Sequence, residues 1–292
     1  MSSSPARTLV LAGALTLTSL LAGCGSGGPA SKPGTQVVAS FYPLQYVAER
    51  VAGPHADVSN LTQPGREPHD LELTVRQTAA IEDADVVVYE RGFQPAVDQA
   101  VDQNGPPHVV DAAGPARVSG DDPHFWLDPT RLSAVASAFE KQLAEVDPAH
   151  EADYARNLAA LQQDLADLDA SYRTGLADCR VHTIVVSHDA FGYLGRRYGL
   201  DVVAINGLSP DAEPSPAHVR QLQELIRDDG ITTVFSEELG SRKLADTLAN
   251  DLGIAAKVLD PLEGLSDATH DQDYLSLMRR NLKALREADS CA

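Results

Sequence analysis

In the stretch Asp85-Val86-Val87-Val88-Tyr89, Asp85 is followed by a short run of apolar, mostly β-branched residues. An apolar run of this length without alternation is typical of a strand buried on both faces, as in a parallel sheet. Segments with a helical pattern stand on either side of it, over residues 74–83 and 93–101. Strands that alternate with helices form βαβ units. The stretch therefore predicts an α/β fold built on parallel sheets.

The same alternation runs along most of the chain. The patterns predict further strands over residues 36–42, 55–62, 108–110, 181–187, 202–205, 231–235 and 255–259. Apolar residues at helical spacing also predict an unusually long helix from residue 148 to about 177. A helix of ~30 residues spans ~45 Å, which is more than the core of one small domain needs. We therefore predict two (βα)4-like α/β lobes with parallel sheets, residues 36–147 and 179–292, joined by one long rigid helix over residues 148–178.

Residues 1–23 have the features of a secretory signal peptide. Arg7 precedes an apolar run over residues 9–21, which is shorter than a membrane-spanning helix needs. The sequence Leu21-Ala22-Gly23-Cys24 that follows resembles a bacterial lipobox, which implies that Cys24 carries lipid and begins the mature chain. Residues 24–35, rich in Gly, Ser and Pro, then form a flexible tether. The alternative is an ordinary signal peptide followed by an incidental cysteine.

The composition is acidic, with a net charge of -19 and a pI of about 4.7. Nucleic-acid binding needs a Lys and Arg footprint for the phosphates, so this balance argues against a nucleic-acid partner. An acidic surface suits a soluble extracytoplasmic protein and concentrates cations mildly; the alternative is that it serves solubility alone. We expect the protein to be a monomer tethered to a membrane.

Cys179 and Cys291 are the two cysteines that remain after Cys24. Export places them in an oxidising compartment, where two spare cysteines tend to pair. We predict a disulfide bond between them.

Three histidines stand in constrained settings far apart in the chain: His69, His124 and His188. His124 lies just before Asp128-Pro129, which is a favourable helix start, and His188 directly follows a predicted strand. Ligands bind outside the carboxyl ends of the strands in open parallel sheets. Imidazole is a good ligand for zinc and other late transition metals, although a single histidine is more often a surface or core residue. We predict that the three close on one metal ion in the cleft between the lobes.

Three segments around these histidines resemble the signature segments of one family. They are Pro64-Gly65-Arg66-Glu67-Pro68-His69-Asp70, Asp122-Pro123-His124-Phe125-Trp126-Leu127-Asp128-Pro129 and Ser187-His188-Asp189-Ala190-Phe191-Gly192-Tyr193. The chain is similar in this respect to the zinc/manganese solute-binding lipoproteins of bacterial ABC transporters. The resemblance implies that the histidine of each segment binds metal. It also implies a non-enzymatic protein that captures Zn(II) and delivers it to a permease.

The fourth ligand implied by the resemblance comes from Leu259-Asp260-Pro261-Leu262-Glu263-Gly264-Leu265. This segment is similar to the Glu-Gly-Leu version of the zinc-binding members, so Glu263 is the expected ligand. Asp260, Asp267 and Glu237 are the alternatives, and Glu263 would then be a solvated loop carboxylate. Three imidazoles and one carboxylate favour Zn(II) over Mn(II), which prefers oxygen-rich sites.

Asp70 and Asp189 each follow a ligand histidine. We expect them to accept hydrogen bonds from the imidazoles and so orient them; the alternative is that they are loop or cap residues. Because imidazoles must lose their protons to bind metal, the affinity should weaken as the pH falls through about 6.5.

Three other functions are the alternatives. A manganese-binding member of the same family is the first. A zinc hydrolase is the second, which would require that Glu263 does not ligate, and the chain has no His-Glu-x-x-His segment. An adhesin is the third, and nothing in the sequence supports it separately. One segment differs from the family pattern. Many zinc-binding members carry a long His- and acid-rich loop before the second ligand, whereas the segment at residues 112–122 is short and has no histidine.

Overall fold

The computed structural model describes residues 34–210 and 212–291, which belong to one compact unit. The predicted signal peptide and Cys24 lie outside these residues, as does nearly all of the predicted tether. Within the described residues, no helix combines the length and apolar character needed to span a membrane.

The first lobe is built on a four-stranded parallel sheet in the order β2-β1-β3-β4. All four residues of β3 are buried, as its apolar run predicts. The strands are β1 (Thr35–Ala39), β2 (Ala56–Asn60), β3 (Val86–Tyr89) and β4 (Val109–Asp111). The helices are α1 (Tyr42–Ala52), α2 (Val75–Asp83), α3 (Pro95–Asn104) and α4 (Ala113–Ala116), with a 3-10 turn η1 (Gly53–His55).

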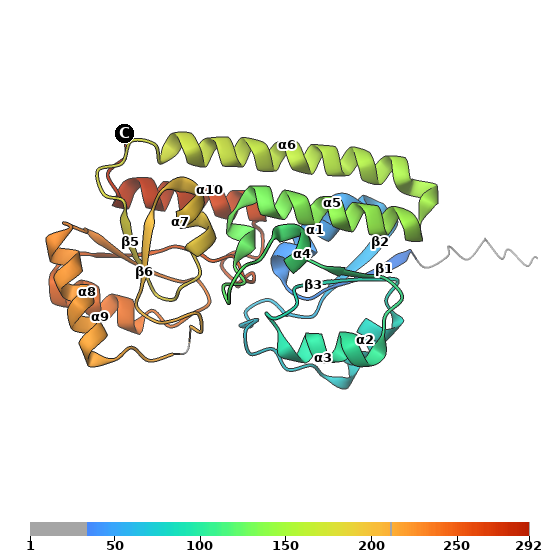
Figure 1. The fold of residues 1–292 in the computed structure, drawn as a ribbon, viewed down its shortest axis with the longest axis horizontal. Helices are drawn as coiled ribbons and strands as arrows, with labels where there is room; N and C mark the ends of the chain where they lie inside the picture. Colours follow the sequence, from blue (N-terminus) through green and yellow to red (C-terminus); the bar gives the residue numbers. More distant parts are fainter. Residues whose placement is uncertain (1–33, 211, 292) are drawn as a thin grey trace, which may run out of the picture. The chain divides into compact units, whose positions relative to one another are not determined.

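The second lobe repeats this arrangement with a four-stranded parallel sheet in the order β6-β5-β7-β8 (Figure 1). Its strands are β5 (Thr183–Val186), β6 (Asp201–Ala204), β7 (Thr233–Ser236) and β8 (Ala255–Val258). Its helices are α7 (Gly192–Tyr198), α8 (Pro216–Asp228), α9 (Lys243–Leu252) and α10 (Tyr274–Ala288). The predicted fold of two parallel α/β lobes is confirmed.

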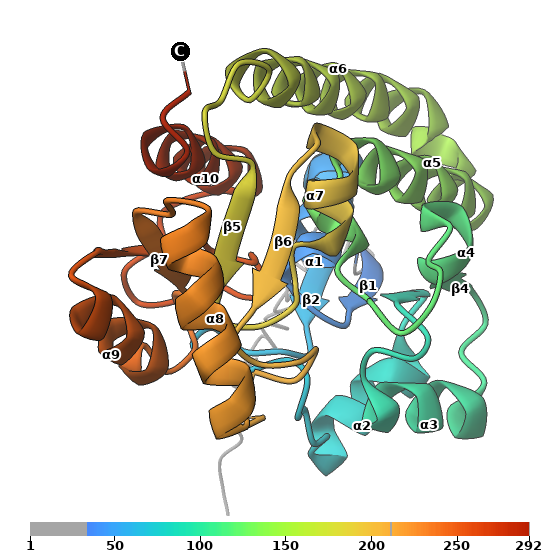
Figure 2. The same cartoon turned by 60° about the vertical axis from the view of Figure 1, so that its left-hand side comes forward.

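The lobes are joined through α5 (Pro129–Val146), the 3-10 turn η3 (Pro148–His150) and the 25-residue helix α6 (Glu151–Gly175). A helix of this length spans ~37 Å. It packs on α1 and α5 of the first lobe and on α10 of the second, which it overlies in Figures 1 and 2. The Tyr172 hydroxyl of α6 donates to the Met278 carbonyl of α10 at 2.6 Å. The long helix therefore braces both lobes.

Among the differences from the sequence prediction, two boundaries and one short helix have local reasons. Strand β1 ends at Ala39 rather than residue 42, because the proline near the start of α1 favours the first helical turn there. The long helix begins at Glu151, since residues 148–150 form the 3-10 turn η3. The short helix α4 carries no long apolar pattern and was not predicted.

Trp126 lies in the 3-10 turn η2 (Phe125–Leu127) and ties the two lobes together. Its side chain is fully buried in a core cluster that contains residues of both lobes. Its indole N–H donates to the Pro261 carbonyl at 2.7 Å, and its carbonyl accepts from the Tyr274 hydroxyl at 2.6 Å. The segment between β4 and α5 is thus fastened to the second lobe.

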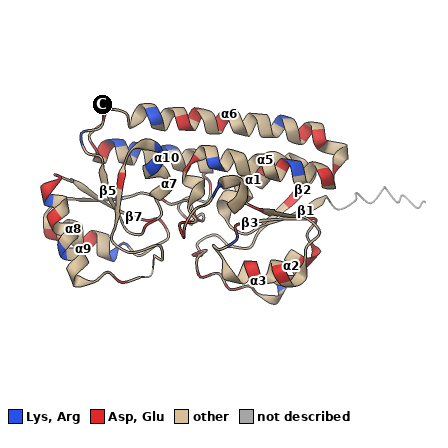
Figure 3. Ribbon diagram, in the orientation of Figure 1, with Lys and Arg blue, Asp and Glu red and all other residues tan. Residues whose placement is uncertain are grey.

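Acidic residues are spread over helices of both lobes, including α2, α3 and α6, whereas α10 carries several basic ones (Figure 3). The basic residues of α10 are Arg279, Arg280, Lys283 and Arg286. The acidic surface of the molecule is therefore not confined to one lobe, which favours a general attraction of cations.

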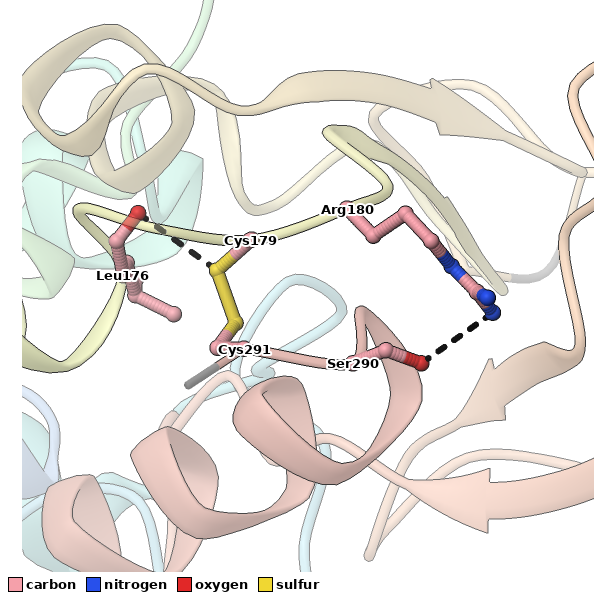
Figure 4. The surroundings of a disulfide bond; sticks show 5 residues. All are labelled: Leu176, Cys179, Arg180, Ser290 and Cys291. Atoms are coloured by element: carbon pink, nitrogen blue, oxygen red, sulfur yellow. Dashed lines mark hydrogen bonds between the residues drawn. A yellow bond between two sulfur atoms is a disulfide. The ribbon is translucent and has the colours of Figure 1, made fainter.

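Cys179 and Cys291 are linked by a disulfide that joins the segment after α6 to the end of α10 (Figure 4). The backbone nearby is also paired, because the Asp289 carbonyl accepts from Arg180 N and Val181 N at 3.0 and 3.1 Å. The disulfide therefore encloses most of the second lobe in one covalent loop, and backbone hydrogen bonds join the same two ends of that loop.

Replacing both cysteines with alanine is expected to lower the free energy of unfolding by about 2–5 kcal/mol, because the bond constrains a long loop of the unfolded chain. The two half-cystines are 112 residues apart. Urea denaturation of the oxidised protein measures the loss. A reductant should destabilise the wild type by a similar amount and leave the double variant unchanged; an equal stability of the two oxidised proteins would contradict the expectation.

Candidate metal site

Four side chains from distant parts of the chain meet beyond the carboxyl ends of the strands. His69 lies in the loop after β2, His124 lies between α4 and η2, and His188 is two residues beyond β5. Glu263 lies in the loop after β8. The carboxyl ends of parallel strands are where such folds place their ligands.

The three imidazoles converge on one oxygen of Glu263. Its Oε1 atom is 3.0 Å from His124 Nε2 and 3.3 Å from the Nε2 atoms of His69 and His188. The Nε2 atoms of His124 and His188 are 3.3 Å apart. All four potential ligand atoms lie within 4.8 Å of one another.

These distances suit a tetrahedral ion. Bonds of ~2.0–2.1 Å from zinc to nitrogen or oxygen put tetrahedral ligand atoms ~3.3 Å apart. Three nitrogens and one oxygen are a donor set that zinc accepts without strain, and manganese prefers more oxygen. The residues therefore fit a closed four-ligand zinc site.

The site is largely shielded from water. His124 and His188 are fully buried and Glu263 is 2% exposed, while the His69 side chain is 14% exposed. The Phe93 ring packs edge-on against His69 with centroids 4.8 Å apart, and Trp126 lies 5.2 Å from His124. An apolar wall of this kind limits solvent access and strengthens electrostatic interactions inside the site. His69 is the ligand nearest to solvent.

The buried carboxylates control the basicity of the imidazoles. Burial opposes the charge on His188, but hydrogen bonds with Glu237 and Glu263 outweigh it and raise the pKa of His188 to about 10. Burial likewise opposes the charge on His124, and its bonds to Asp122 and Glu263 raise the pKa of His124 above the ordinary value. The metal-free pocket therefore holds protons that an incoming cation must displace.

Two acids in the pocket respond in opposite directions. Burial alone would raise the pKa of Glu263, but hydrogen bonds from His124, His188 and His69 hold it well below the usual range. Burial, followed by the negative charge of Glu263, raises the pKa of Glu67 to about 8. Glu263 thus supplies the negative charge of the pocket, while Glu67 is neutral beside it at neutral pH.

The outer ring nitrogens of His124 and His188 are each paired with a carboxylate. His124 Nδ1 lies 2.9 Å from Asp122 Oδ1, and His188 Nδ1 lies 2.6 Å from Glu237 Oε1. Ser187 Oγ also donates to the same oxygen of Glu237. A carboxylate at Nδ1 fixes the tautomer and turns the Nε2 lone pair toward the ion.

Glu237 therefore has at His188 the role expected for Asp189, and Asp122 has the same role at His124. Asp70 is exposed and Asp189 is half-buried, and neither is among the imidazole partners that the described residues provide. The backbone gives the reason for Asp189, whose N–H donates to the Gly207 carbonyl at 3.0 Å and so fixes the residue in a loop contact.

The other candidate carboxylates have structural partners or point elsewhere. Asp260 accepts from Leu262 N at 2.9 Å and pairs with Arg280 at 3.2 Å. Asp267 is exposed. Glu237 is near the cluster, but as the partner of His188 Nδ1.

A rigid loop carries Glu263. Leu262 has a positive φ of 58°, an unfavourable conformation for a non-glycine residue that the surroundings must hold in place. Asn281 supports the loop through two bonds to the backbone of Asp260, at 3.0 and 2.6 Å, and Trp126 holds Pro261. The carboxylate is thus placed before any ligand arrives.

Two signals in the sequence point to the partners that local patterns left unassigned. Asp122 stands two residues before His124, a spacing at which an Asp side chain reaches the following backbone, and it does accept from His124 N at 3.1 Å. Glu237 follows β7, the neighbour of β5 in the sheet, so the residues after these two strands lie side by side. The order of the strands in the sheet, however, cannot be predicted from a single sequence.

Comparison with known proteins places these features in one family. The family model described as "Zinc-uptake complex component A periplasmic" matches residues 37–288. The high-affinity zinc uptake system protein ZnuA of Bacillus subtilis is 32% identical over an alignment of 298 residues with its gaps. The alignment covers 92% of this chain and 93% of that protein. The match therefore extends over nearly all of both chains.

The zinc-binding lipoprotein AdcA of Streptococcus pneumoniae is 35% identical over 275 residues, which cover 86% of this chain. The match covers only 55% of AdcA, so the chain spans about half the length of this relative. The crystal structure of the Zn(II)-bound ZnuA-like domain of that protein superposes with a TM-score of 0.77 at 34% identity, covering 88% of this chain and 99% of the domain.

Proposed function

Since this chain belongs to the family of periplasmic zinc-uptake components, we propose that it captures one Zn(II) ion and delivers it to an ABC permease. In this proposal His69, His124, His188 and Glu263 are the ligands. The observation that carries it is the convergence of three Nε2 atoms on one carboxylate oxygen at 3.0 to 3.3 Å.

Capture, rather than catalysis, suits four protein ligands. A catalytic zinc site keeps one position for water or substrate, whereas a closed site uses all four for protein atoms. The ligands come from both lobes, so the contact between the lobes is what brings the site together. Zinc arriving at the exposed edge of His69 displaces the protons of the buried imidazoles, and its charge is offset by Glu263.

The anchor and the boundaries of the lobes form part of the same proposal. Residues 1–23 are the signal peptide, Cys24 is lipidated, and residues 24–35 tether the protein outside the cytoplasm as a monomer. Residues 36–147 and 179–292 are the two lobes, and residues 148–178 link them. Lipid labelling of cells should mark the wild type and not a Cys24→Ala variant; equal labelling of both would reject the anchor.

The central test is metal content and metal preference of the tag-free mature protein. Native purification followed by elemental analysis should find one zinc per chain. A competition titration should then show that zinc is retained against an excess of Mn(II), because the donor set is rich in nitrogen. A protein that carries no zinc, or that exchanges it readily for manganese, would contradict the proposal.

A further inference from the structure

Asp122 connects the first lobe's ligand His124 to the second lobe. Its Oδ1 atom accepts from the His124 backbone N–H at 3.1 Å and lies 2.9 Å from His124 Nδ1. Its Oδ2 atom points the other way, toward the guanidinium of Arg196 on α7 at 3.4 Å. The carboxylate is only 16% exposed. It therefore fills the space between a metal ligand and a helix of the opposite lobe.

Gly192 makes this close approach possible. It is the first residue of α7, and a Cβ atom on it would lie 2.6 Å from Asp122 Oδ2. Carbon and oxygen atoms that are not bonded to each other pack at well over 3 Å, so any side chain at this position must displace the carboxylate or the helix. The absence of a side chain is thus what lets α7 and Asp122 meet.

The contact around this point holds α7 against the first lobe. Ser119 N donates to the Tyr193 hydroxyl at 3.1 Å. Arg131 of α5 and Arg196 of α7 both lie against the Tyr193 ring, at 4.6 and 4.4 Å from its centre. Ser119 and Arg131 thus hold Tyr193, the residue after Gly192, against the first lobe, so a group added at residue 192 would press on Asp122.

We propose that Gly192 is a positioning residue for zinc capture, which lets the second lobe seat Asp122 and thereby orient the imidazole of His124. The inference rests on the proposed zinc function. It makes His124 a ligand whose orientation depends on contact between the lobes, although its own backbone belongs to the first lobe. Metal affinity is then coupled to the docking of α7 through one carboxylate.

A double-mutant cycle on the mature protein tests this coupling, with zinc affinity measured by chelator competition. Gly192→Ala should weaken zinc binding by about 10-fold, because losing the proper partner of a ligand imidazole typically costs 10–100-fold. Asp122→Ala should weaken it by about 10–100-fold for the same reason. The double variant should bind no more weakly than Asp122→Ala alone, because the carboxylate that the added methyl group displaces is gone.

Gly195→Ala provides the matched control on the same helix. A Cβ atom there would lie 2.7 Å from the Leu200 carbonyl oxygen and from a methyl group of Val202, so this clash is with the backbone as well as a side chain and does not involve Asp122. This change should lower the thermal stability of the metal-free protein. Its effect on zinc affinity should be small and should simply add to that of Asp122→Ala.

The double variant also tests the inference if Gly192→Ala alone has a folding defect. If Gly192→Ala alone does not fold, removing the Asp122 carboxylate should restore folding and leave the affinity of Asp122→Ala. The inference is overturned if folded Gly192→Ala binds zinc as tightly as the wild type. It is also overturned if the double variant binds zinc more weakly than Asp122→Ala by the same factor by which Gly192→Ala alone weakens binding. Failure of the wild type to bind zinc would instead reject the proposed function.

Discussion

Replacing Glu263 with glutamine is expected to weaken zinc binding by at least about 100-fold, more than the loss of a ligand's outer partner usually costs. The substitution keeps the size of a side chain that is 2% exposed and held by a rigid loop. It removes the only charged donor among the four groups whose ligand atoms lie within 4.8 Å of one another. The ion would then be left with three neutral imidazoles in a dry pocket, where uncompensated charge is costly.

The neighbouring carboxylates supply graded controls for this experiment. Glu237→Gln should weaken zinc binding by about 10–100-fold, because Glu237 pairs with the outer nitrogen of His188 and not with the nitrogen that lies beside Glu263. Asp267→Asn should leave the affinity unchanged, since this side chain is exposed. Chelator competition on the three variants and the wild type gives the order. A loss at Asp267 equal to that at Glu263, or no loss at Glu263, would show that the fourth ligand is wrongly assigned.

The apparent zinc affinity is expected to rise as the pH increases from about 6 to about 9. The pKa of His188 is raised to about 10 and that of His124 is raised above its ordinary value, so the metal-free site still carries protons at neutral pH. Zinc must displace them, and each proton released changes the binding constant by about tenfold per pH unit. Falling pH favours the protonated, metal-free form and weakens binding. The raised pKa values place this change above the window near 6.5 that an ordinary histidine would give.

Competition titrations with a pH-matched chelator measure this slope. In Glu237→Gln the pKa of His188 should fall, because its largest favourable partner loses its charge. The variant should therefore show a shallower slope at alkaline pH than the wild type. A constant zinc affinity over the whole range would be incompatible with protonated imidazoles in the metal-free pocket.

Local patterns in the sequence were enough for the architecture. Apolar runs such as residues 86–89 are typical of strands buried on both faces, so they predict a parallel sheet without knowledge of its neighbours. The Asp128-Pro129 helix start was also predictable, and the Asp128 side chain does accept from Thr130 N at 2.9 Å. Such signals act over a few residues, and the sequence contains all of the groups involved.

The sequence alone also brought out the four candidate ligands, because histidines beside strand ends and the resemblance of their segments restrict the choice. Only the tertiary structure showed which side chains contact the ligand imidazoles and orient them. Glu237 meets His188 because β7 and β5 are neighbours, and Asp122 meets Gly192 because the lobes are in contact. Contacts of this kind depend on the order of strands and the packing of one lobe on the other. Both arise from interactions between residues far apart in the chain, which local spacing does not record.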